Sequence, residues 1–348
     1  MAAFPARDLA AALAGDGACA DLAADPAIEA LFTIDEETGM TGALGLKPGQ
    51  LTGEILLNLD TEEDDEIDIG CAGGIDVTAS ANYTLTSTSS NFVKIEIKGL
   101  QGGHSGMDIH KGFGNSNVIL GRLLYAGISN EIQLISIDGG GLRNAIPREA
   151  HALVAVNNAS EYLQKLETLK SDILEEFASV EKDLEINFAT AENTENGLSV
   201  EDSKKIILAL KSAHNGVYRM SPDVADLVEA SNNIARVELK NGGLKILNLT
   251  RSSVESTKMA VAEQLKSVFE LAGMQVEFSG SYPGWKPKPG AEIIKIMTEI
   301  YEKDFGAKPH VVACHAGLEC GIIGANYPKM EMVSFGPTIR GAHSPDER

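Results

Sequence analysis

The sequence predicts an α/β domain that is interrupted by an inserted α+β domain, and three observations support this fold class. Two short segments, 29–34 and 54–60, each read as a strand that ends in carboxylates. From about residue 74 the pattern changes to alternating and β-branched residues, which is typical of antiparallel strands with one solvent-facing side. Prolines cluster at 283–289 and mark a hinge. The expected domains are the α/β domain at 1–73 and 284–348, and the insertion at 74–283.

The α/β domain begins with residues 1–30, which are rich in Ala and Asp and suit a short helix broken by two glycines. The apolar segment 29–34 then reads as a buried strand, and Gly39 and Gly42 allow a turn or close packing after it. A second short strand over 54–60 runs into further acidic residues. Because ligands bind beyond the carboxyl ends of strands in open α/β sheets, we expect the ligand site at this edge.

The insertion mixes strands and helices. Segment 83–100 alternates in the manner of an antiparallel strand. Apolar residues recur at helical spacing over 117–127 and 162–177, and segment 257–285 has a helix followed by a strand. This mixture predicts an α+β arrangement.

The α/β domain resumes after the hinge. Segment 291–306 predicts an amphipathic helix, and segments 310–323 and 331–337 read as strand and turn. The chain has no clean short-period repeat.

The composition is that of an ordinary globular protein. The 348 residues correspond to about two domains at roughly 150 residues each. Hydrophobic residues make up 43% and charged residues 23%, and no segment approaches the ~18 apolar residues that a membrane span needs. The 29 Lys and Arg against 50 Asp and Glu give a net charge of −21, which repels phosphate backbones and anionic lipid headgroups. We therefore expect neither nucleic acid nor a membrane as a partner.

The cysteines indicate a reducing compartment. Cys19, Cys71, Cys314 and Cys320 lack the spacing of a zinc ribbon or a redox motif. The N-terminus lacks the basic flank and long apolar core of a signal peptide. We therefore expect a cytoplasmic protein in which Cys314 and Cys320 are buried free thiols rather than metal ligands.

Several residues are candidates for chemistry. They are Glu36 and Glu37 after one strand, Asp60 after the next, His104 in a GGHSG loop, the segment 315–320 and His343. Carboxylates and imidazoles are the ligands of zinc, manganese and cobalt, and a further carboxylate could deprotonate a metal-bound water. Adjacent residues on a strand point to opposite faces, so the two glutamates can share a site only if the backbone turns there, as Gly39 suggests. Taken singly, each feature also fits an ordinary polar surface.

Seven motifs in order closely resemble the aminoacylhistidine dipeptidase family, also called peptidase D, and they cover nearly all of residues 31–348. The motifs are LFTIDEETGMTGA, NLDTEEDDEIDIGCAGG, IKGLQGGHSGMDIHKGFGNSN, GGGLRNAIPREA, SYPGW, HAGLECG and GPTIRGAHSPDE. The resemblance implies a cytosolic di-zinc peptidase of the aminoacylase and carboxypeptidase clan. It implies a zinc-peptidase-like catalytic domain with an inserted lid or dimerisation domain, and hydrolysis of dipeptides that typically end in histidine.

The resemblance also implies roles for residues of the catalytic domain. Glu36 matches the general base that activates a metal-bound water and later returns the proton to the leaving amine. Glu37, Asp60 and His343 match metal ligands. The implied cofactor is zinc, two ions in the family, with manganese or cobalt as substitutes.

In the lid, His104 matches the histidine that stabilises the oxyanion of the tetrahedral intermediate. Asn144 and Arg251 match positions that bind the carboxylate and carbonyl of the substrate, and a guanidinium suits a carboxylate physically. Arg143 and Arg148 are rivals of Arg251 for this role.

Two residues of the HAGLEC segment admit two interpretations. His315 and Glu319 could line the wall of the catalytic pocket, or they could belong to a hydrogen-bonded core turn.

The chain departs from the family pattern at its beginning. The family's H-x-D motif is not recognisable, no histidine precedes His104, and Asp8 and Asp16 are weak matches to the aspartate that bridges two metals. The chain also stops five residues after His343, where relatives continue. We therefore expect a shortened member of the family, under-ligated because catalytic zinc takes at least three protein ligands, and consequently of doubtful activity.

Alternative functions follow from these departures. One is a non-catalytic fragment or relative that acts through its lid as a dimerisation or binding module. Another is a deacetylase or carboxypeptidase of the same clan, although the long lid and the SYPGW and HAGLECG motifs favour the dipeptidase. The expected partners are a small peptide substrate and a second copy of the chain in a homodimer.

Overall fold

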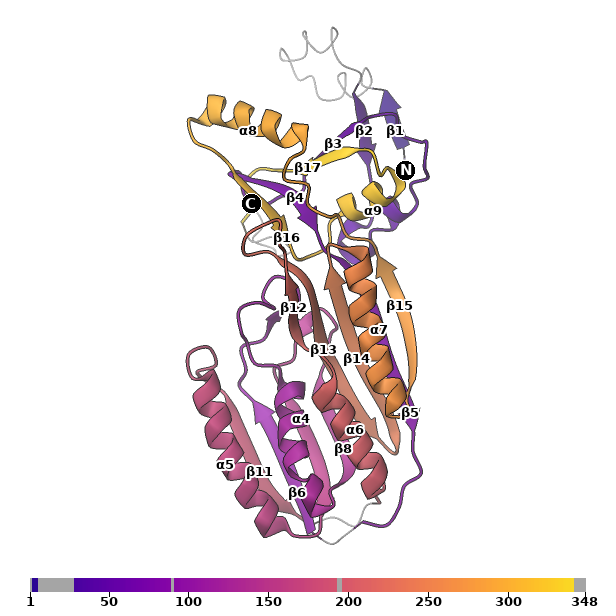
Figure 1. Cartoon of the computed structure of the whole chain (residues 1–348), viewed down its shortest axis with the longest axis vertical. Coiled ribbons are helices and arrows are strands. Elements are labelled where there is room, and N and C mark those ends of the chain that lie inside the picture. Colours follow the sequence, from indigo (N-terminus) through magenta and orange to yellow (C-terminus); the bar gives the residue numbers. More distant parts are fainter. Residues whose placement is uncertain (1, 6–27, 89–90, 193–195, 341–348) are drawn as a thin grey trace. The chain divides into compact units, whose positions relative to one another are not determined.

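The computed structural model describes residues 2–5, 28–88, 91–192 and 196–340 (Figure 1). Contacts divide the chain into two compact units. Unit 1 comprises Met1–Gly73, Pro222–Leu227 and Tyr282–Arg348, and unit 2 comprises Gly74–Ser221 and Val228–Ser281. The mixed α/β fold class is confirmed, whereas the role of unit 2 as a lid stays a prediction.

Unit 1 is built on a four-stranded mixed sheet. Its strands in spatial order are β16 (His310–Cys314), β4 (Glu66–Cys71), β17 (Glu331–Ser334) and β3 (Ile55–Asn58). β16 is parallel to β4 and β17 is parallel to β3, while β17 and β4 are antiparallel. The carboxyl end of β3 therefore lies beside that of β17.

Two helices cover opposite faces of this sheet. Met332 packs in a cluster with apolar residues of α9 (Glu319–Asn326), and its neighbour Val333 packs with apolar residues of α8 (Glu292–Phe305). Adjacent residues of a strand point to opposite faces, so the two clusters lie on opposite sides of β17. The proline-rich stretch lies beside the end of β4. The Cys71 N–H donates to the Trp285 carbonyl at 3.0 Å, and the Trp285 N–H donates to the Cys71 carbonyl at 2.9 Å.

The remaining elements of unit 1 correct two expectations. Among the described residues, β2 (Glu29–Phe32) pairs with β1 (Ala2–Pro5) alone, in a separate two-stranded sheet. Phe32 is 56% exposed, so the strand is not buried. Two short helices follow β2, namely α2 (Glu36–Gly39) and α3 (Thr41–Leu44). The second correction concerns segment 310–323, which was expected to contain only strand and turn; its last residues form α9, since their apolar side chains bury against α3.

Unit 2 contains a nine-stranded sheet. The main path in spatial order is β11 (Glu185–Ala191), β6 (Asn91–Lys98), β10 (Ala150–Val156), β8 (Gln133–Gly140), β13 (Val228–Lys240), β14 (Gly243–Ser252), β5 (Gly73–Asn82) and β15 (Gln275–Tyr282), and β12 (Gly216–Met220) pairs with β13. The pairings from β11 to β14 are antiparallel, as the alternating pattern predicts. A separate ladder joins β7 (Gly103–His104) to β9 (Ala145–Ile146).

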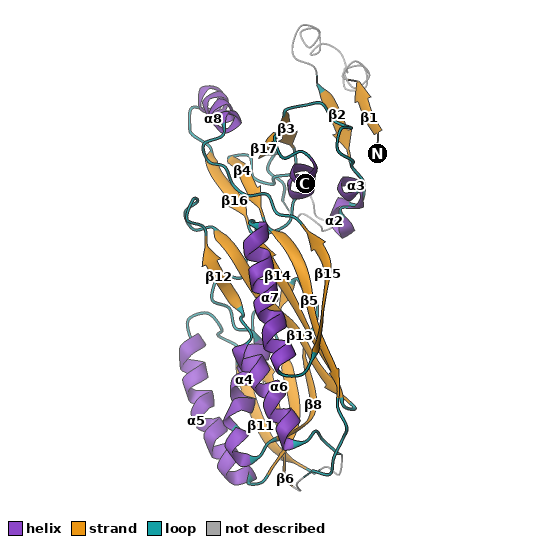
Figure 2. Ribbon diagram, turned by 45° about the vertical axis from the view of Figure 1, so that its right-hand side comes forward, coloured by secondary structure: helices purple, strands orange, loops and turns teal. Residues whose placement is uncertain are grey.

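Helices of unit 2 pack on the sheet (Figure 2). They are α4 (Ser116–Ala126), α5 (Ala159–Phe177), α6 (Val200–Ser212) and α7 (Glu255–Leu271), with a short 3-10 turn at Ile128–Asn130. Side chains of Asn115, Asn158 and Ser199 cap the first three of these helices by accepting backbone N–H bonds. Their buried aliphatic faces and the strands form one large apolar core.

Within the part of the chain that the structure describes, none of the helices combines the length and hydrophobicity that crossing a bilayer requires.

Candidate functional site

The two glutamates of unit 1 lie on a tight helical turn. Asp35 and Met40 flank α2 with left-handed backbones, at φ of 62° and 52°, so these residues make the turn that was expected at Gly39. The Thr41 hydroxyl donates to Asp35 Oδ2 at 2.8 Å and stabilises this conformation. At Gly42, a Cβ atom would lie 2.5 Å from the Ile34 nitrogen, so only glycine permits this close approach.

Glu36 is the first residue of α2 and is half-buried. Glu37 follows it in the same turn, and the structure describes its backbone only. Successive side chains on a helix are about 100° apart, in contrast to the opposite faces of a strand. The backbone turn required for the two residues to serve one site is therefore present.

Asp60 lies two residues beyond β3 and is exposed. The next residue, Thr61, is buried, and its hydroxyl lies 3.2 Å from Asp68 Oδ2 and 2.9 Å from the Ser334 hydroxyl. A Cβ at Gly336 would lie 2.0 Å from the Thr61 carbonyl oxygen, so the backbones also approach closely. These contacts hold the loop that presents Asp60 against the sheet.

Asp68 carries a buried carboxyl group, 6% exposed, in the middle of this sheet. Burial raises its pKa to about 6, against the opposing effect of the Thr61 hydrogen bond. Its Oδ1 atom is buried and has no hydrogen-bond partner among the described residues. The folded chain therefore keeps a proton on Asp68 up to about pH 6, well above the range in which an ordinary carboxyl ionises.

The HAGLEC residues are buried. His315 is 5% exposed and Glu319, the first residue of α9, is 7% exposed. The Thr33 hydroxyl donates to Glu319 Oε2 at 2.7 Å, which connects the end of β2 with the start of α9. This bond agrees with the interpretation as a hydrogen-bonded core turn, and a role in a pocket wall stays a prediction.

Three of the four cysteines lie among the described residues, and all three are free thiols. Burial raises the pKa of Cys71 to about 11 and raises the pKa of Cys314 and Cys320 further. These thiols therefore stay protonated at neutral pH, a form that neither binds metal nor reacts readily.

Metal binding by unit 1 remains a prediction. No group of three or more His, Cys, Asp or Glu within residues 28–88, 91–192 and 196–340 is placed to hold a metal ion. His343, Asp8 and Asp16 lie outside the described residues. The described residues alone therefore do not make up a metal-binding set.

Unit 2 brings His104 and Arg251 together. His104 lies in β7, and Arg251 lies in β14 and is 5% exposed. The Arg251 Nη2 atom lies 3.4 Å from His104 Nε2. The sequence analysis placed both residues in one site, and here they are neighbours although 147 positions separate them.

Two backbone hydrogen bonds determine the proton position on His104. The N–H groups of Gly106 and Met107 donate to Nδ1, at 3.3 and 3.1 Å. Nδ1 is therefore an acceptor, and the neutral ring carries its proton on Nε2. Burial lowers the pKa of His104, and the nearby Arg251 charge lowers it further, while Asp108 opposes them. At neutral pH the Nε2–H group and the Arg251 guanidinium are two adjacent donors, which suits an anionic oxygen placed between them.

The rival arginines have other partners. Arg143 contacts Asp76 Oδ2 at 3.1 Å and donates to the Asn248 carbonyl at 2.8 Å and the Thr78 hydroxyl at 2.7 Å. The exposed Arg148 donates its Nε–H to the Leu100 carbonyl at 3.0 Å. Contact with His104 therefore distinguishes Arg251 from both.

Asn144 is exposed and its backbone belongs to the same cluster. Its carbonyl accepts the N–H of Ser105, the residue that follows His104, at 2.7 Å. The buried Asn233 side chain donates to the carbonyls on either side, those of Arg143 at 3.1 Å and Ala145 at 2.8 Å. The sequence analysis missed Asn233; the polar run around it, within an otherwise apolar strand, was the available signal.

Comparison with known proteins shows what the chain is similar to. Residues 7–348 match the model of peptidase family M20/M25/M40. The cytosol non-specific dipeptidase of Escherichia coli K12 is 41% identical over 327 residues, which are 92% of this chain and 67% of that protein. The crystal structure of aminoacylhistidine dipeptidase from Vibrio alginolyticus superposes with a TM-score of 0.88 at 43% identity, covering 92% of this chain and 66% of that one.

The chain thus spans about two thirds of the length of these relatives. A more distant structure, aminopeptidase PepT from Bacillus cereus, has 15% identity and a TM-score of 0.43 and covers 92% of this chain and 59% of that one.

Proposed function

The chain belongs to peptidase family M20/M25/M40, and from this we propose that it hydrolyses the peptide bond of dipeptides. The relatives at 41% and 43% identity are named as dipeptidases, which supports a small peptide as the substrate. A C-terminal histidine in the substrate is supported by the name of the Vibrio relative alone.

The observation that carries the proposal is the donor pair of His104 and Arg251. Hydrolysis of a peptide bond develops negative charge on the carbonyl oxygen, and donors that are held in place before the reaction stabilise that charge. The His104 Nε2–H group, fixed by two bonds to Nδ1, is such a donor. The guanidinium 3.4 Å away adds the positive charge that a substrate carboxylate or carbonyl needs.

The proposed proton transfers involve Glu36. Its carboxylate takes a proton from the attacking water and returns it to the amine that leaves. His104 donates its Nε2–H to the oxyanion, and Arg251 together with Asn144 binds the carboxylate and carbonyl of the peptide. The left-handed turn at Asp35 presents Glu36 at the start of a helix.

We propose Glu37, Asp60 and His343 as metal ligands, with zinc as the metal and manganese or cobalt as substitutes. The metal would polarise the carbonyl and lower the pKa of a bound water. The exposed Asp60 carboxylate, beside the anchored Thr61, has the donor chemistry that such an ion requires.

We propose the cytoplasm as the location and a small peptide as the partner. The Escherichia coli relative is named a cytosol dipeptidase, and the net charge of −21 disfavours nucleic acid and anionic lipid. A homodimer is the proposed assembly.

Turnover of a β-alanyl-histidine dipeptide by wild type and His104→Gln tests the proposal. We expect kcat to fall by about 10²–10³ while KM changes much less, because the donor acts mainly on the transition state. His110→Gln is the matched control, since His110 is exposed in the same loop. Equal kcat for wild type and His104→Gln would contradict the proposed role.

A second candidate is a non-catalytic module that dimerises or binds ligands through unit 2. It is favoured by the contrast between the well-packed unit 2 and the incomplete metal-binding set among the described residues of unit 1. A folded wild-type chain without turnover at added metal that sediments as a dimer would support this candidate.

A further inference from the structure

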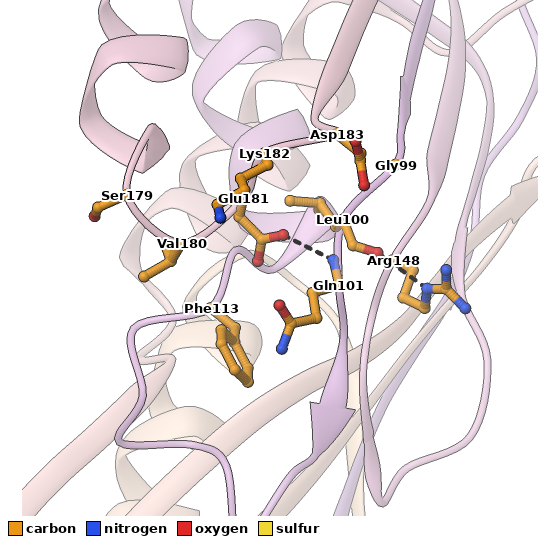
Figure 3. Close-up of a pocket in the computed structure, with 10 residues that line it drawn as sticks. All are labelled: Gly99, Leu100, Gln101, Phe113, Arg148, Ser179, Val180, Glu181, Lys182 and Asp183. Carbon is orange, nitrogen blue, oxygen red and sulfur yellow. Dashed lines mark hydrogen bonds between the residues drawn. The ribbon is translucent and has the colours of Figure 1, made fainter.

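Glu181 is a buried carboxylate whose two oxygens bind two separate backbone N–H groups. Figure 3 shows the first of these bonds, to Gln101. It is 5% exposed and lies in the turn between α5 and β11. Its Oε2 accepts the Gln101 N–H at 2.7 Å, and its Oε1 accepts the Gly114 N–H at 2.7 Å. Charge-assisted bonds of this length are among the stronger hydrogen bonds in proteins.

These two N–H groups stand at the two ends of the loop that carries His104. The loop leaves the sheet after β6, passes through β7 and returns at Asn115, the cap of α4. Gln101 lies three positions before His104, and Gly114 lies ten positions after it. Glu181, which lies outside the loop in sequence, therefore holds its two ends together. These two ends, at Gln101 and Gly114, are called the neck of the loop.

The support behind Glu181 is itself rigid. The N–H groups of Val180 and Glu181 donate to the Phe177 carbonyl, at 3.0 and 2.8 Å, at the end of α5. Gly99, with φ of 79°, lies so close to this turn that a Cβ would be 1.9 Å from the Asp183 carbonyl oxygen. The neck is thus packed against the turn as well as bonded to it.

We propose that Glu181 is a positioning residue for His104, which it serves by clamping both ends of the His104 loop. The proposal rests on the proposed function in one respect, namely that His104 acts on the substrate. Only a carboxylate can accept both bonds, because a glutamine of the same shape has one acceptor oxygen and would direct an NH2 group at the other N–H. With one bond lost, the two ends of the loop are held less tightly, and the half-buried imidazole moves away from its position beside Arg251.

Glu181→Gln tests the clamp, with Glu175→Gln as the matched control. Glu175 is an exposed carboxylate on α5. In wild type, burial and Arg251 hold the pKa of His104 below its ordinary value of about 6.5. We expect a histidine NMR titration to show this pKa rising toward 6.5 in Glu181→Gln and unchanged in Glu175→Gln. A pKa of His104 that is the same in all three folded proteins would overturn the proposal.

The kinetic readout follows the same logic. A misplaced catalytic group costs rate more than binding, so we expect kcat to fall by about 10- to 100-fold with KM changed much less. The titration needs no substrate, so a wild-type chain without turnover would contradict the proposed function and leave the test of the clamp intact.

Amide hydrogen exchange in the wild-type chain tests the clamp even where the variant fails to fold. The amides of Gln101 and Gly114 are expected to exchange at least about 100-fold more slowly than those of the exposed loop residues His110 and Gly112. Exchange of Gln101 and Gly114 as fast as these references would overturn the proposal.

Discussion

The chemistry available to His104 depends on which of its ring nitrogens accepts hydrogen bonds from the backbone and which carries the proton. Because Nδ1 accepts from Gly106 and Met107, the ring can offer its Nε2–H and cannot serve as a base at that atom while neutral. Burial and Arg251 reinforce this state by lowering the pKa of His104.

Arg251→Gln tests the electrostatic half of this pair. Removing the positive charge should raise the pKa of His104, because one of the two causes that lower it disappears. It should also lower kcat/KM for a dipeptide by about 100-fold through the lost charge-assisted bond. Histidine NMR titration and steady-state kinetics measure the two effects. Arg148→Gln is the control, and an equal loss in both variants would refute the assignment of Arg251.

Asp68 makes stability depend on pH. Its pKa is about 6 in the folded chain against an ordinary 3.8, so the folded state binds more protons than the unfolded state between these values. Stability should therefore fall as pH rises from about 4 to about 6. Thermal unfolding gives the difference in unfolding free energy between Asp68→Asn and wild type. We expect this difference to shift in favour of the variant by about 2–3 kcal/mol from pH 4 to pH 7. A difference in stability between the two proteins that does not change with pH would refute the raised pKa of Asp68.

At the scale of elements, short connections rather than long helices place the candidate residues. The α2 and α3 turns carry Glu36, the β3 to β4 connection carries Asp60, and the β7 loop carries His104. Thr41 bonds to Asp35 within the first of these segments, whereas Thr61 ties the second to β4 and Glu181 ties the third to the turn after α5. Functional side chains thus lie on loops that a rigid scaffold holds.

Gly42→Ala tests the close packing beneath α2. The added methyl would lie 2.5 Å from the Ile34 nitrogen, so the backbone must shift and we expect a loss of about 1–3 kcal/mol in unfolding free energy. Gly290→Ala is the control, because a Cβ at this exposed glycine would meet no atom within 4 Å. Chemical denaturation of both variants gives the answer, and equal stability of the two would disprove the tight contact.

At the scale of the whole molecule, the sequence predicted the mixed α/β fold class, because alternation and helical spacing are local properties. It did not predict the exposure of Phe32, since burial of a strand depends on how many partners the strand finds. It also missed α9, because a short apolar segment does not distinguish helix from strand.

Some residues of the candidate site could likewise be found from the sequence, and others could not. The motifs contain Glu36, Asp60 and His104, and the family resemblance implied Arg251. The sequence could not rank Arg251 above its rivals, because the three arginines differ in their three-dimensional contacts. Asn233 and Glu181 act through bonds to backbone groups far away in the sequence, and no local pattern encodes such partners.

The decisive measurement for a metal-dependent dipeptidase is hydrolysis of β-alanyl-histidine by the zinc-loaded chain and by its Glu36→Gln variant. Glu54→Gln, an exposed carboxylate of unit 1, serves as the control. We expect turnover by wild type and the control, and a kcat lowered by about 10²–10⁴ in Glu36→Gln at equal metal content. Equal turnover with and without the Glu36 carboxylate, or none from the folded, metal-loaded wild type, would contradict the proposed function.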